Sequence, residues 1–294
     1  MIRKVKYFFA RIISALMANP LFAKCPNSIH TPDESKRLDI SNMKLVFEDD
    51  FSRELDPSVW KTIPDKPERR GGYWSEEQCF IKDGKLIIRT EYKKDGKYGA
   101  GWYTGTCSTQ GLREYKHGYF EVSCKTPAAE GLWSAFWLQS ESMADNWGTD
   151  GGKNGAEIDI MESPYYNDPV NTANAYRNTT IHTVHVDGYG DLYHNKRSYF
   201  YRPDKNMYKE FNTYGVLWTK KEYIFYINGK ETWRTDFGVS QAPEFLWLSV
   251  EIAGKDNANP ENTDNKFTWA GDIRNNPEKL MPADFVIDYV RVYQ

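Results

Sequence analysis

Three carboxylates interrupt an otherwise apolar stretch of the chain at residues 155–163. They belong to Glu157, Asp159 and Glu162, and the residues between them are isoleucines and a methionine. In a regular β-strand, Glu157 and Asp159 would share one face and Glu162 would point to the other, into the core. Burying a charge in that way is costly. A β-bulge between Asp159 and Glu162 would add one residue to the strand and bring all three acids to the same face.

Two carboxylates on either side of one bond can hydrolyse a glycosidic linkage. Their separation, ~5 Å or ~7 to 9 Å, distinguishes the retaining from the inverting mechanism. With the bulge, the backbones of Glu157 and Glu162 are about 13 Å apart, so only converging side chains would reach the retaining distance. Two neighbouring carboxylates also cannot both ionise freely, so one is expected to keep its proton near neutral pH and act as an acid.

The elements around the acids follow the period of β-strands. Apolar and polar residues alternate at 118–126 and 285–293, and two further runs at 214–219 and 222–227 are followed by the turn Asn228-Gly229. No helical period extends over twelve residues. We therefore expect an all-β sandwich or barrel of antiparallel sheets. Three stretches are long enough to be loops around a binding face: 145–154, 187–212 and 254–282.

Composition excludes several kinds of partner. The chain has 294 residues, which we interpret as one large domain, and a net charge of -3 with both signs interspersed. Nucleic acid and membrane surfaces are therefore not expected partners. Ten Trp and twenty Tyr supply flat faces for sugar rings, although most should be strand formers or core residues.

The cysteines do not have the spacing of a zinc site. Cys107 and Cys124 could face each other on neighbouring strands, or they could be buried free thiols. The other two are Cys25 and Cys79.

The N-terminus has the features of an export signal. Arg3, Lys4 and Lys6 precede an apolar run at 7–23, which Arg11 interrupts, so we predict a signal peptide at 1–23 and no membrane span. Residues 24–43 are polar and aperiodic and are interpreted as a leader or linker, with the catalytic domain at 44–294. The protein is expected to be secreted, periplasmic or on the cell surface, and monomeric.

The pattern Glu-x-Asp-x-x-Glu resembles the catalytic strand of glycoside hydrolase family 16 in its bulged, laminarinase-like form. The resemblance extends in order over most of the chain. The matching stretches are VFEDDF at 46–51, GKLIIR at 84–89, GYFEV at 118–122, GLWSAFWL at 131–138, VHVDGYG at 184–190, YGVLW at 214–218 and VIDYVRVY at 286–293.

This resemblance implies a fold and a mechanism. The fold would be a concanavalin A-like jelly-roll β-sandwich with an open substrate groove, and the activity would be hydrolysis of a β-glucan or β-galactan with retention of configuration. Glu157 would be the nucleophile and Glu162 the general acid/base. Asp159 would hold Glu157 by hydrogen bonding. No cofactor is required, and the partner is a polysaccharide.

Aromatic residues and a histidine are further candidates for substrate binding. Trp133 and Trp137 are four residues apart on an expected strand and share a face, which the resemblance places in the groove; the alternative is a core pair. Trp147 lies in a glycine-rich loop before the acids. His185 matches the strand beside them, where it would bond near Asp159 or be a structural histidine.

Three functions agree with these features. The first is an endo-hydrolase of β-1,3- or mixed-linkage β-glucan. The second is an endo-hydrolase of a β-galactan such as agar, porphyran, carrageenan or a mucin-type glycan, because loops at Trp74 and Trp147 depart from the laminarinase pattern. The third is a lectin without catalysis. Some family members bind a structural calcium ion, for which Asp50 and Asp288 are the candidate ligands.

Overall fold

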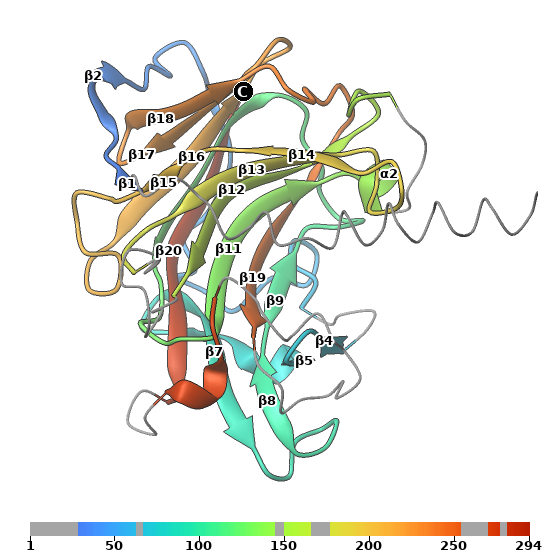
Figure 1. Ribbon diagram of the computed structural model, residues 1–294, viewed down its shortest axis with the longest axis vertical. Coiled ribbons are helices and arrows are strands. Elements are labelled where there is room, and N and C mark those ends of the chain that lie inside the picture. Colours follow the sequence, from blue (N-terminus) through green and yellow to red (C-terminus); the bar gives the residue numbers. More distant parts are fainter. Residues whose placement is uncertain (1–28, 63–66, 145–149, 166–176, 254–269, 277–280) are drawn as a thin grey trace, which may run out of the picture.

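The computed structural model (Figure 1) describes residues 29–294 apart from 63–66, 145–149, 166–176, 254–269 and 277–280. Strands dominate the described part of the chain. Its α-helix α2 (Glu141–Ala144) has four residues, and two 3-10 turns, η2 (Glu76–Gln78) and η5 (Ile273–Asn275), have three each. No helix among the described residues is long and apolar enough to cross a membrane. The expected all-β class is confirmed.

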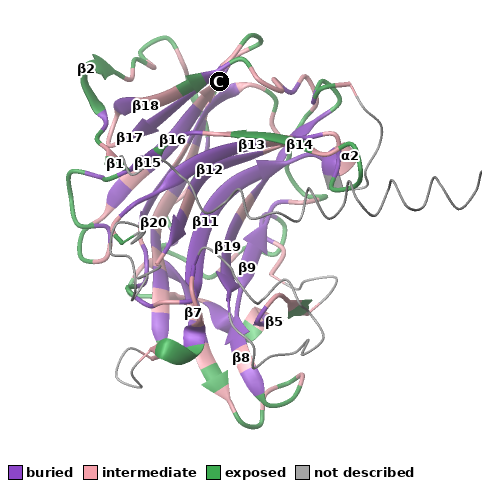
Figure 2. Cartoon of the chain, viewed as in Figure 1, coloured by how far each residue is buried: buried purple, intermediate pink, exposed green. Residues whose placement is uncertain are grey.

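A six-stranded antiparallel sheet contains the three acids. Its central strands are apolar, aromatic and β-branched, and they are buried along almost their whole length (Figure 2). The order of strands is β14 (His194–Arg197), β13 (Ile181–Val186), β12 (Ala156–Pro164), β11 (Leu132–Gln139), β19 (Phe245–Ile252) and β9 (Thr106–Ser108).

A twelve-stranded sheet lies against it and completes the sandwich. Its path is β2 (Asp33–Arg37), β18 (Lys230–Thr235), β17 (Tyr223–Ile227), β16 (Asn212–Trp218), β10 (Gly118–Lys125), β20 (Ala283–Tyr293), β7 (Lys85–Lys93), β8 (Gly101–Thr104), β5 (Gly72–Trp74) and β4 (Glu68–Arg69), with β3 (Leu45–Asp49) paired to β20 and β6 (Cys79–Lys82) paired to β7.

Two short pairings differ from the expected antiparallel pattern. Strands β5 and β8 pair in parallel at the end of the large sheet. Strand β1 (Ile29–His30) pairs in parallel with β15 (Phe200–Tyr201) in a small separate sheet. Each of these pairings joins strands of two to four residues. They leave the two-sheet architecture of the jelly roll intact.

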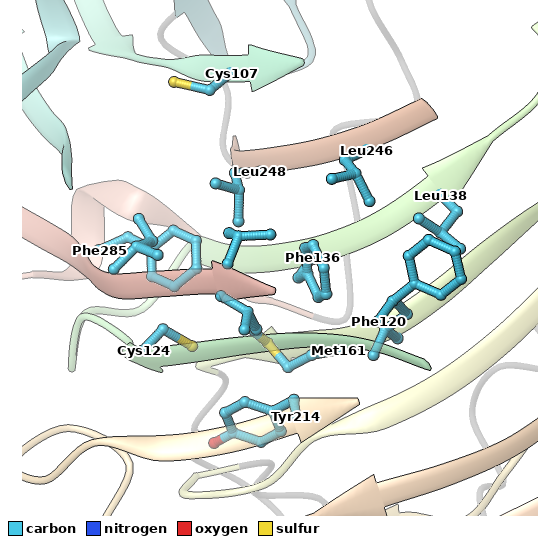
Figure 3. Packing of buried hydrophobic residues seen from close by; sticks show 14 of the residues in the cluster. Cys107, Phe120, Cys124, Phe136, Leu138, Met161, Tyr214, Leu246, Leu248 and Phe285 are labelled. Carbon is cyan, nitrogen blue, oxygen red and sulfur yellow. The ribbon is translucent and has the colours of Figure 1, made fainter. Parts of the chain in front are cut away.

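The core lies between the two large sheets. Phe136, Leu138 and Met161 from the six-stranded sheet meet Phe120 and Tyr214 from the other sheet (Figure 3), and all five are fully buried. Each such side chain contributes about 1.5–3 kcal/mol through removal of apolar surface from water. The burial of Met161 is notable for function, because Met161 immediately precedes Glu162 in the chain.

The three cysteines among the described residues are buried and free rather than paired. Cys107 lies on β9 and Cys124 on β10, which belong to different sheets, so the alternative of neighbouring strands is wrong and that of buried free thiols is confirmed. Both are fully buried, and Figure 3 shows them among the apolar side chains of the core. Cys79 is also a buried free thiol. Burial raises the pKa of the Cys124 thiol well above its usual range. Cys25 lies outside the described residues.

Residues 33–43, within the stretch interpreted as a leader or linker, lie against the large sheet. Strand β2 pairs with β18. After it, Leu38, Ile40 and Met43 cover a cluster on the outer face that contains Tyr119 and Tyr226. The physical reason is that these three apolar side chains can bury themselves only against such a face. The predicted signal peptide at 1–23 lies outside the described residues.

Candidate active site

Strand β12 contains the bulge that the spacing of the acids predicted. Asp159 of β12 lies opposite Thr183 of β13, and Glu162 lies opposite Ile181. The register shifts between these two pairs. On β11 the shift falls between Phe136 and Trp137 and leaves Ile160 without a partner. Ile160 is therefore the inserted residue.

The bulge reverses the parity of the strand. Ile158, Ile160 and Met161 are fully buried in the core. Glu157, Asp159 and Glu162 lie on the opposite side, which we call the acid face of the six-stranded sheet. Figure 1 shows β11, β12 and β13 running side by side and curving across this part of the molecule.

Glu157 is held by two residues from other segments. The Tyr189 hydroxyl donates to its Oε2 atom. Gln139 Nε2 lies 3.4 Å from the same oxygen and donates to the Tyr189 hydroxyl at 2.6 Å. Gln139 lies directly opposite Glu157 in the β11–β12 register. Both residues orient the carboxylate, and neither was among the residues proposed from the sequence, because nothing in the local pattern links position 189 to position 157.

His185 lies beside the acids, as expected from its strand. Its Nε2 atom is 2.9 Å from Oδ2 of Asp159 and 3.6 Å from Oε1 of Glu157. Its Nδ1 atom contacts the hydroxyl of Tyr193, on which the imidazole also stacks. Burial alone would lower the pKa of His185, but the charges of Glu157 and Asp159 outweigh burial and raise it to about 9. The imidazole is therefore a cation at neutral pH.

The two glutamates have different proton affinities. Burial, with the charge of Asp159 second, raises the pKa of Glu157 to about 7 and that of Glu162 to about 8. The Thr183 hydroxyl donates to Oε2 of Glu162 at 2.9 Å. Near neutral pH, Glu157 is the more readily ionised of the two and Glu162 the more readily protonated.

The predicted tryptophans lie on the acid face. Trp137 is opposite Asp159, and Trp133 is opposite Pro164. Both belong to a small buried apolar cluster separate from the main core, and their role in sugar binding stays a prediction. Trp137 stacks on Trp247 with ring centroids 5.0 Å apart. Trp133 and Trp137 are only 7% and 8% exposed. Trp147 lies outside the described residues.

Two arginines border the same face and were not found from the sequence. Arg69 Nε donates to the buried Glu251 carboxylate at 2.8 Å, and Arg70 Nε lies 3.4 Å from it. The guanidinium of Arg70 covers the Trp133 ring at 4.7 Å. Glu251 is opposite Trp133 in the β11–β19 register. Arg69 also interacts with the charge of Glu157, so it links this end of the acid face to the acids. The only signal in the sequence was the Arg-Arg pair itself.

Glu157, Asp159 and His185 are the group of three potential metal ligands found among the described residues, with ligand atoms within 4.8 Å of one another. They fit an ion-pair cluster better than a metal site. The Nε2 atom of His185 pairs with Oδ2 of Asp159 at 2.9 Å, and a protonated imidazole has no lone pair for a metal.

The calcium candidates have partners of their own. Asp288 pairs with Lys85 at 2.7 Å, and Asp50 accepts the Ser52 backbone N–H at 3.0 Å. Calcium binding there stays a prediction.

Several known proteins are similar to this chain. A β-glucanase of Rhodothermus marinus is 25% identical over 231 residues, covering 74% of this chain and 71% of the relative. The endo-1,3-1,4-β-glycanase EglC of Rhizobium meliloti is 25% identical over 78% of this chain. The α subunit of clotting factor G of Tachypleus tridentatus is 27% identical over 76% of this chain. The chain spans only 50% and 29% of the length of the last two relatives.

Solved structures share the fold. The catalytic domain of an endo-1,3-β-glucanase from Thermotoga petrophila aligns with a TM-score of 0.63 and 22% identity over 86% of this chain and 98% of that domain. The endo-β-1,3-glucanase of Pyrococcus furiosus aligns with a TM-score of 0.64 and 21% identity over 92% and 98%. At this identity the alignments establish the jelly-roll fold.

A family model decides the membership. The model for the glycoside hydrolase family 16 domain of β-porphyranases A–D matches residues 44–294. That match includes every strand of the six-stranded sheet and all the acids on it. The chain therefore belongs to glycoside hydrolase family 16.

Proposed function

We propose that the chain is a retaining endo-hydrolase that cuts internal β-linkages of a polysaccharide on the acid face of its six-stranded sheet. The observation that carries this proposal is the β12 bulge. It brings Glu157 and Glu162 to one face while their pKa values, about 7 and about 8, differ in the order that a nucleophile and an acid need.

In the first step, Glu157 attacks the anomeric carbon while the bond from that carbon to the glycosidic oxygen breaks. Tyr189 and Gln139 hold Oε2, so Oε1 is the attacking atom. Glu162 gives its proton to the departing oxygen, which leaves as a hydroxyl. The products of this step are a glycosyl-enzyme ester and an ionised Glu162.

In the second step, Glu162 takes a proton from a water molecule that attacks the same carbon. The ester bond breaks, Glu157 regains its charge, and Glu162 is protonated again. Two inversions at one carbon give net retention. The pKa of His185, raised to about 9, keeps its imidazole a cation in both steps. This cation keeps a fixed field beside Glu157, whose own charge disappears and returns.

The first candidate substrate is β-1,3- or mixed-linkage β-glucan. The support comes from the curated relatives named for such activities, the β-glucanase of R. marinus and EglC of R. meliloti. A neutral glucan would be recognised mainly by aromatic faces and hydrogen bonds. Trp137, Trp247 and Gln139 supply both along the acid face.

A β-galactan of the porphyran type is the second candidate, and two specific observations favour it. The family model that matches the chain is that of β-porphyranases. In addition, the guanidinium of Arg70 lies over the Trp133 ring, with its Nε atom 3.4 Å from the Glu251 carboxylate that Arg69 already binds. Guanidinium groups bind anionic oxygens strongly, so a sulfated galactan would gain contacts there that a neutral glucan would not.

A lectin does not need this arrangement of acids. A binding face is not improved by two carboxyls whose protonated forms are stabilised by burial. We also propose that the protein is exported, because Arg3, Lys4 and Lys6 precede an apolar run and a polymer substrate is met outside the cell.

A substrate panel with product sizing tests the function. Laminarin, lichenan, agarose, porphyran and carrageenan would each be incubated with the wild-type protein and with Glu157→Ala as the inactive control. We expect a rapid fall in chain length on one class and, by NMR, initial products with the β configuration. Release of monosaccharide alone, or of α products, would contradict the endo-acting or the retaining part of the proposal.

A further inference from the structure

A second histidine, His182, lies on β13 but on the side away from the acids. It is fully buried between the two large sheets. Its ring stacks on Phe225 of β17, with the ring centroids 4.7 Å apart. His182 takes no part in the proposed catalytic steps. A polar ring in an apolar core needs hydrogen-bond partners for both nitrogens.

The first partner belongs to the bulge. The Nδ1 atom of His182 lies 2.6 Å from the backbone carbonyl oxygen of Ile160. Ile160 is the inserted residue, which has no register partner on either β11 or β13. A carbonyl offers only lone pairs, so Nδ1 must carry the hydrogen and donate it. The side chain thus satisfies a buried backbone group of the inserted residue.

The second partner belongs to the opposite sheet. The Nε2 atom lies 2.9 Å from the hydroxyl oxygen of Thr232 on β18. Because Nδ1 holds the hydrogen, Nε2 can only accept, and the single hydrogen of the Thr232 hydroxyl is shared between Nε2 and the Phe225 carbonyl oxygen, 3.0 Å away. Burial lowers the pKa of His182 to about 4, which keeps the ring neutral and this tautomer in place near neutral pH. His182 therefore links the bulge of the catalytic strand to the twelve-stranded sheet.

Other bonds from this part of the chain end on Glu162 itself. The Thr180 hydroxyl donates to the Glu162 carbonyl at 3.1 Å, and the Thr183 hydroxyl donates to its carboxylate. The charged groups that act on the Glu162 carboxyl are Asp159, His185 and Glu157. All of these contacts depend on the position of the bulge in β12. A strand that slips by one residue exchanges its two faces and would turn Glu162 into the core.

We propose that His182 is a positioning residue for catalysis, which holds the β12 bulge by bonding the Ile160 carbonyl and thereby fixes the direction of the Glu162 side chain. The proposal rests on the proposed role of Glu162 as acid/base. It predicts that loss of the Nδ1 bond damages proton transfer more than it damages substrate binding.

Four variants separate the bond from the packing. His182→Phe keeps a ring against Phe225 and removes both hydrogen bonds. His182→Asn places an N–H donor near the position of Nδ1 and can restore the bond to Ile160. His182→Gln reaches toward Thr232 instead. Phe225→Leu removes the stacking and leaves the hydrogen bonds of His182, so it is the control for packing alone.

In His182→Phe, we expect kcat on the polysaccharide to fall by about 100-fold, the scale of general acid catalysis, with KM changed by less than about threefold. Formation of the glycosyl-enzyme from an activated aryl glycoside should fall much less, because its leaving group needs no proton. The alkaline limb of the pH profile should move. His182→Asn should recover most of kcat, and Phe225→Leu should lower the melting temperature without moving the alkaline limb.

Equal pH profiles and equal leaving-group dependence in His182→Phe and Phe225→Leu would overturn the proposal. If His182→Phe does not fold, the comparison of His182→Asn with His182→Gln tests the proposal. Equal kcat values and equal alkaline limbs in these two variants would overturn the proposal. A 13C NMR titration of the Glu162 carboxyl, assigned by its loss in Glu162→Gln, gives a readout independent of activity. Full polysaccharide activity in Glu162→Ala would refute the proposed function instead, while the NMR shift between wild type and His182→Phe would still test the positioning.

Discussion

His185 on β13 reaches Asp159 on the neighbouring strand β12, with its Nε2 atom 2.9 Å from Oδ2. The pair places a positive charge beside Glu157 and Glu162, and the charge of each of these carboxyls changes during the reaction. That charge lowers the pKa of both Glu157 and Glu162 relative to what burial and Asp159 alone would produce. The cation therefore helps to keep Glu157 ionised near neutral pH.

The pH dependence of activity follows from this arrangement. Wild-type kcat/KM should be bell-shaped, because Glu157 must be ionised and Glu162 protonated, with its maximum between about pH 7 and 8. His185→Gln removes the cation, so Glu157 becomes harder to ionise and the acidic limb should move to higher pH. Initial rates measured from pH 5 to 9 check this. An acidic limb that stays in place or moves to lower pH would contradict the role of the cation.

The contact of Tyr189 with Glu157 can be tested by removing one oxygen. The hydroxyl donates to the carboxylate and so lowers its pKa. Tyr189→Phe should raise that pKa and reduce kcat/KM at pH 6 by about tenfold, the scale of a hydrogen bond to a charged group at a partly exposed site. Tyr199→Phe is the matched control, because Tyr199 is an exposed tyrosine stacked on His30. Equal profiles for the two variants would exclude an orienting role for Tyr189.

The ionised carboxyl of Glu162 should lower the free energy of unfolding of the protein above neutral pH. Its folded-state pKa, about 8, is above the usual value of 4.5, so the folded chain binds a proton that the unfolded chain releases. The free energy of unfolding therefore falls as pH rises through this range. Glu162→Gln removes this loss and should be more stable than wild type by about 1–3 kcal/mol at pH 9. At pH 4 the difference should be small. Thermal unfolding at both pH values checks this, and a difference independent of pH would be inconsistent with the raised pKa.

Trp133 lies on the acid face, with one ring face covered by Arg70. If the remaining surface of the ring contacts sugar, Trp133→Ala should weaken polysaccharide affinity by about 1–3 kcal/mol. Trp233→Ala, on the twelve-stranded sheet, is the control and should affect stability alone. Isothermal titration with a catalytically inactive background measures the affinities. Unchanged affinity in Trp133→Ala with a lower melting temperature would assign this ring to structure.

The roles of the two glutamates can be separated with azide and an activated aryl β-glycoside. In Glu162→Ala the first step proceeds, and azide attacks the glycosyl-enzyme without a general base, so the product should be a β-glycosyl azide. In Glu157→Ala azide itself must displace the aglycone, so the product should be an α-glycosyl azide. NMR of the products distinguishes the anomers. The reverse pairing of variants and products would exchange the nucleophile and the acid/base.

The sequence alone determined the fold class and the catalytic strand. Period-two alternation was sufficient for an all-β sandwich, because inward and outward positions alternate along each strand. The bulge was also predictable. Glu162 would otherwise be a buried charge, and one inserted residue, Ile160, is the smallest change that prevents it. The ordered matching stretches predicted the family that the domain model confirmed.

Only the tertiary structure decided which residues surround the acids. Tyr189 reaches Glu157 from 32 residues away, and Arg69 meets Glu251 across 182 residues. His182, three residues before His185 and on the other face of β13, bonds both the inserted residue Ile160 and the opposite sheet. Such contacts depend on strand order and loop path. Local periodicity specifies which face of a strand a side chain takes, but not which distant strand or loop that face will meet.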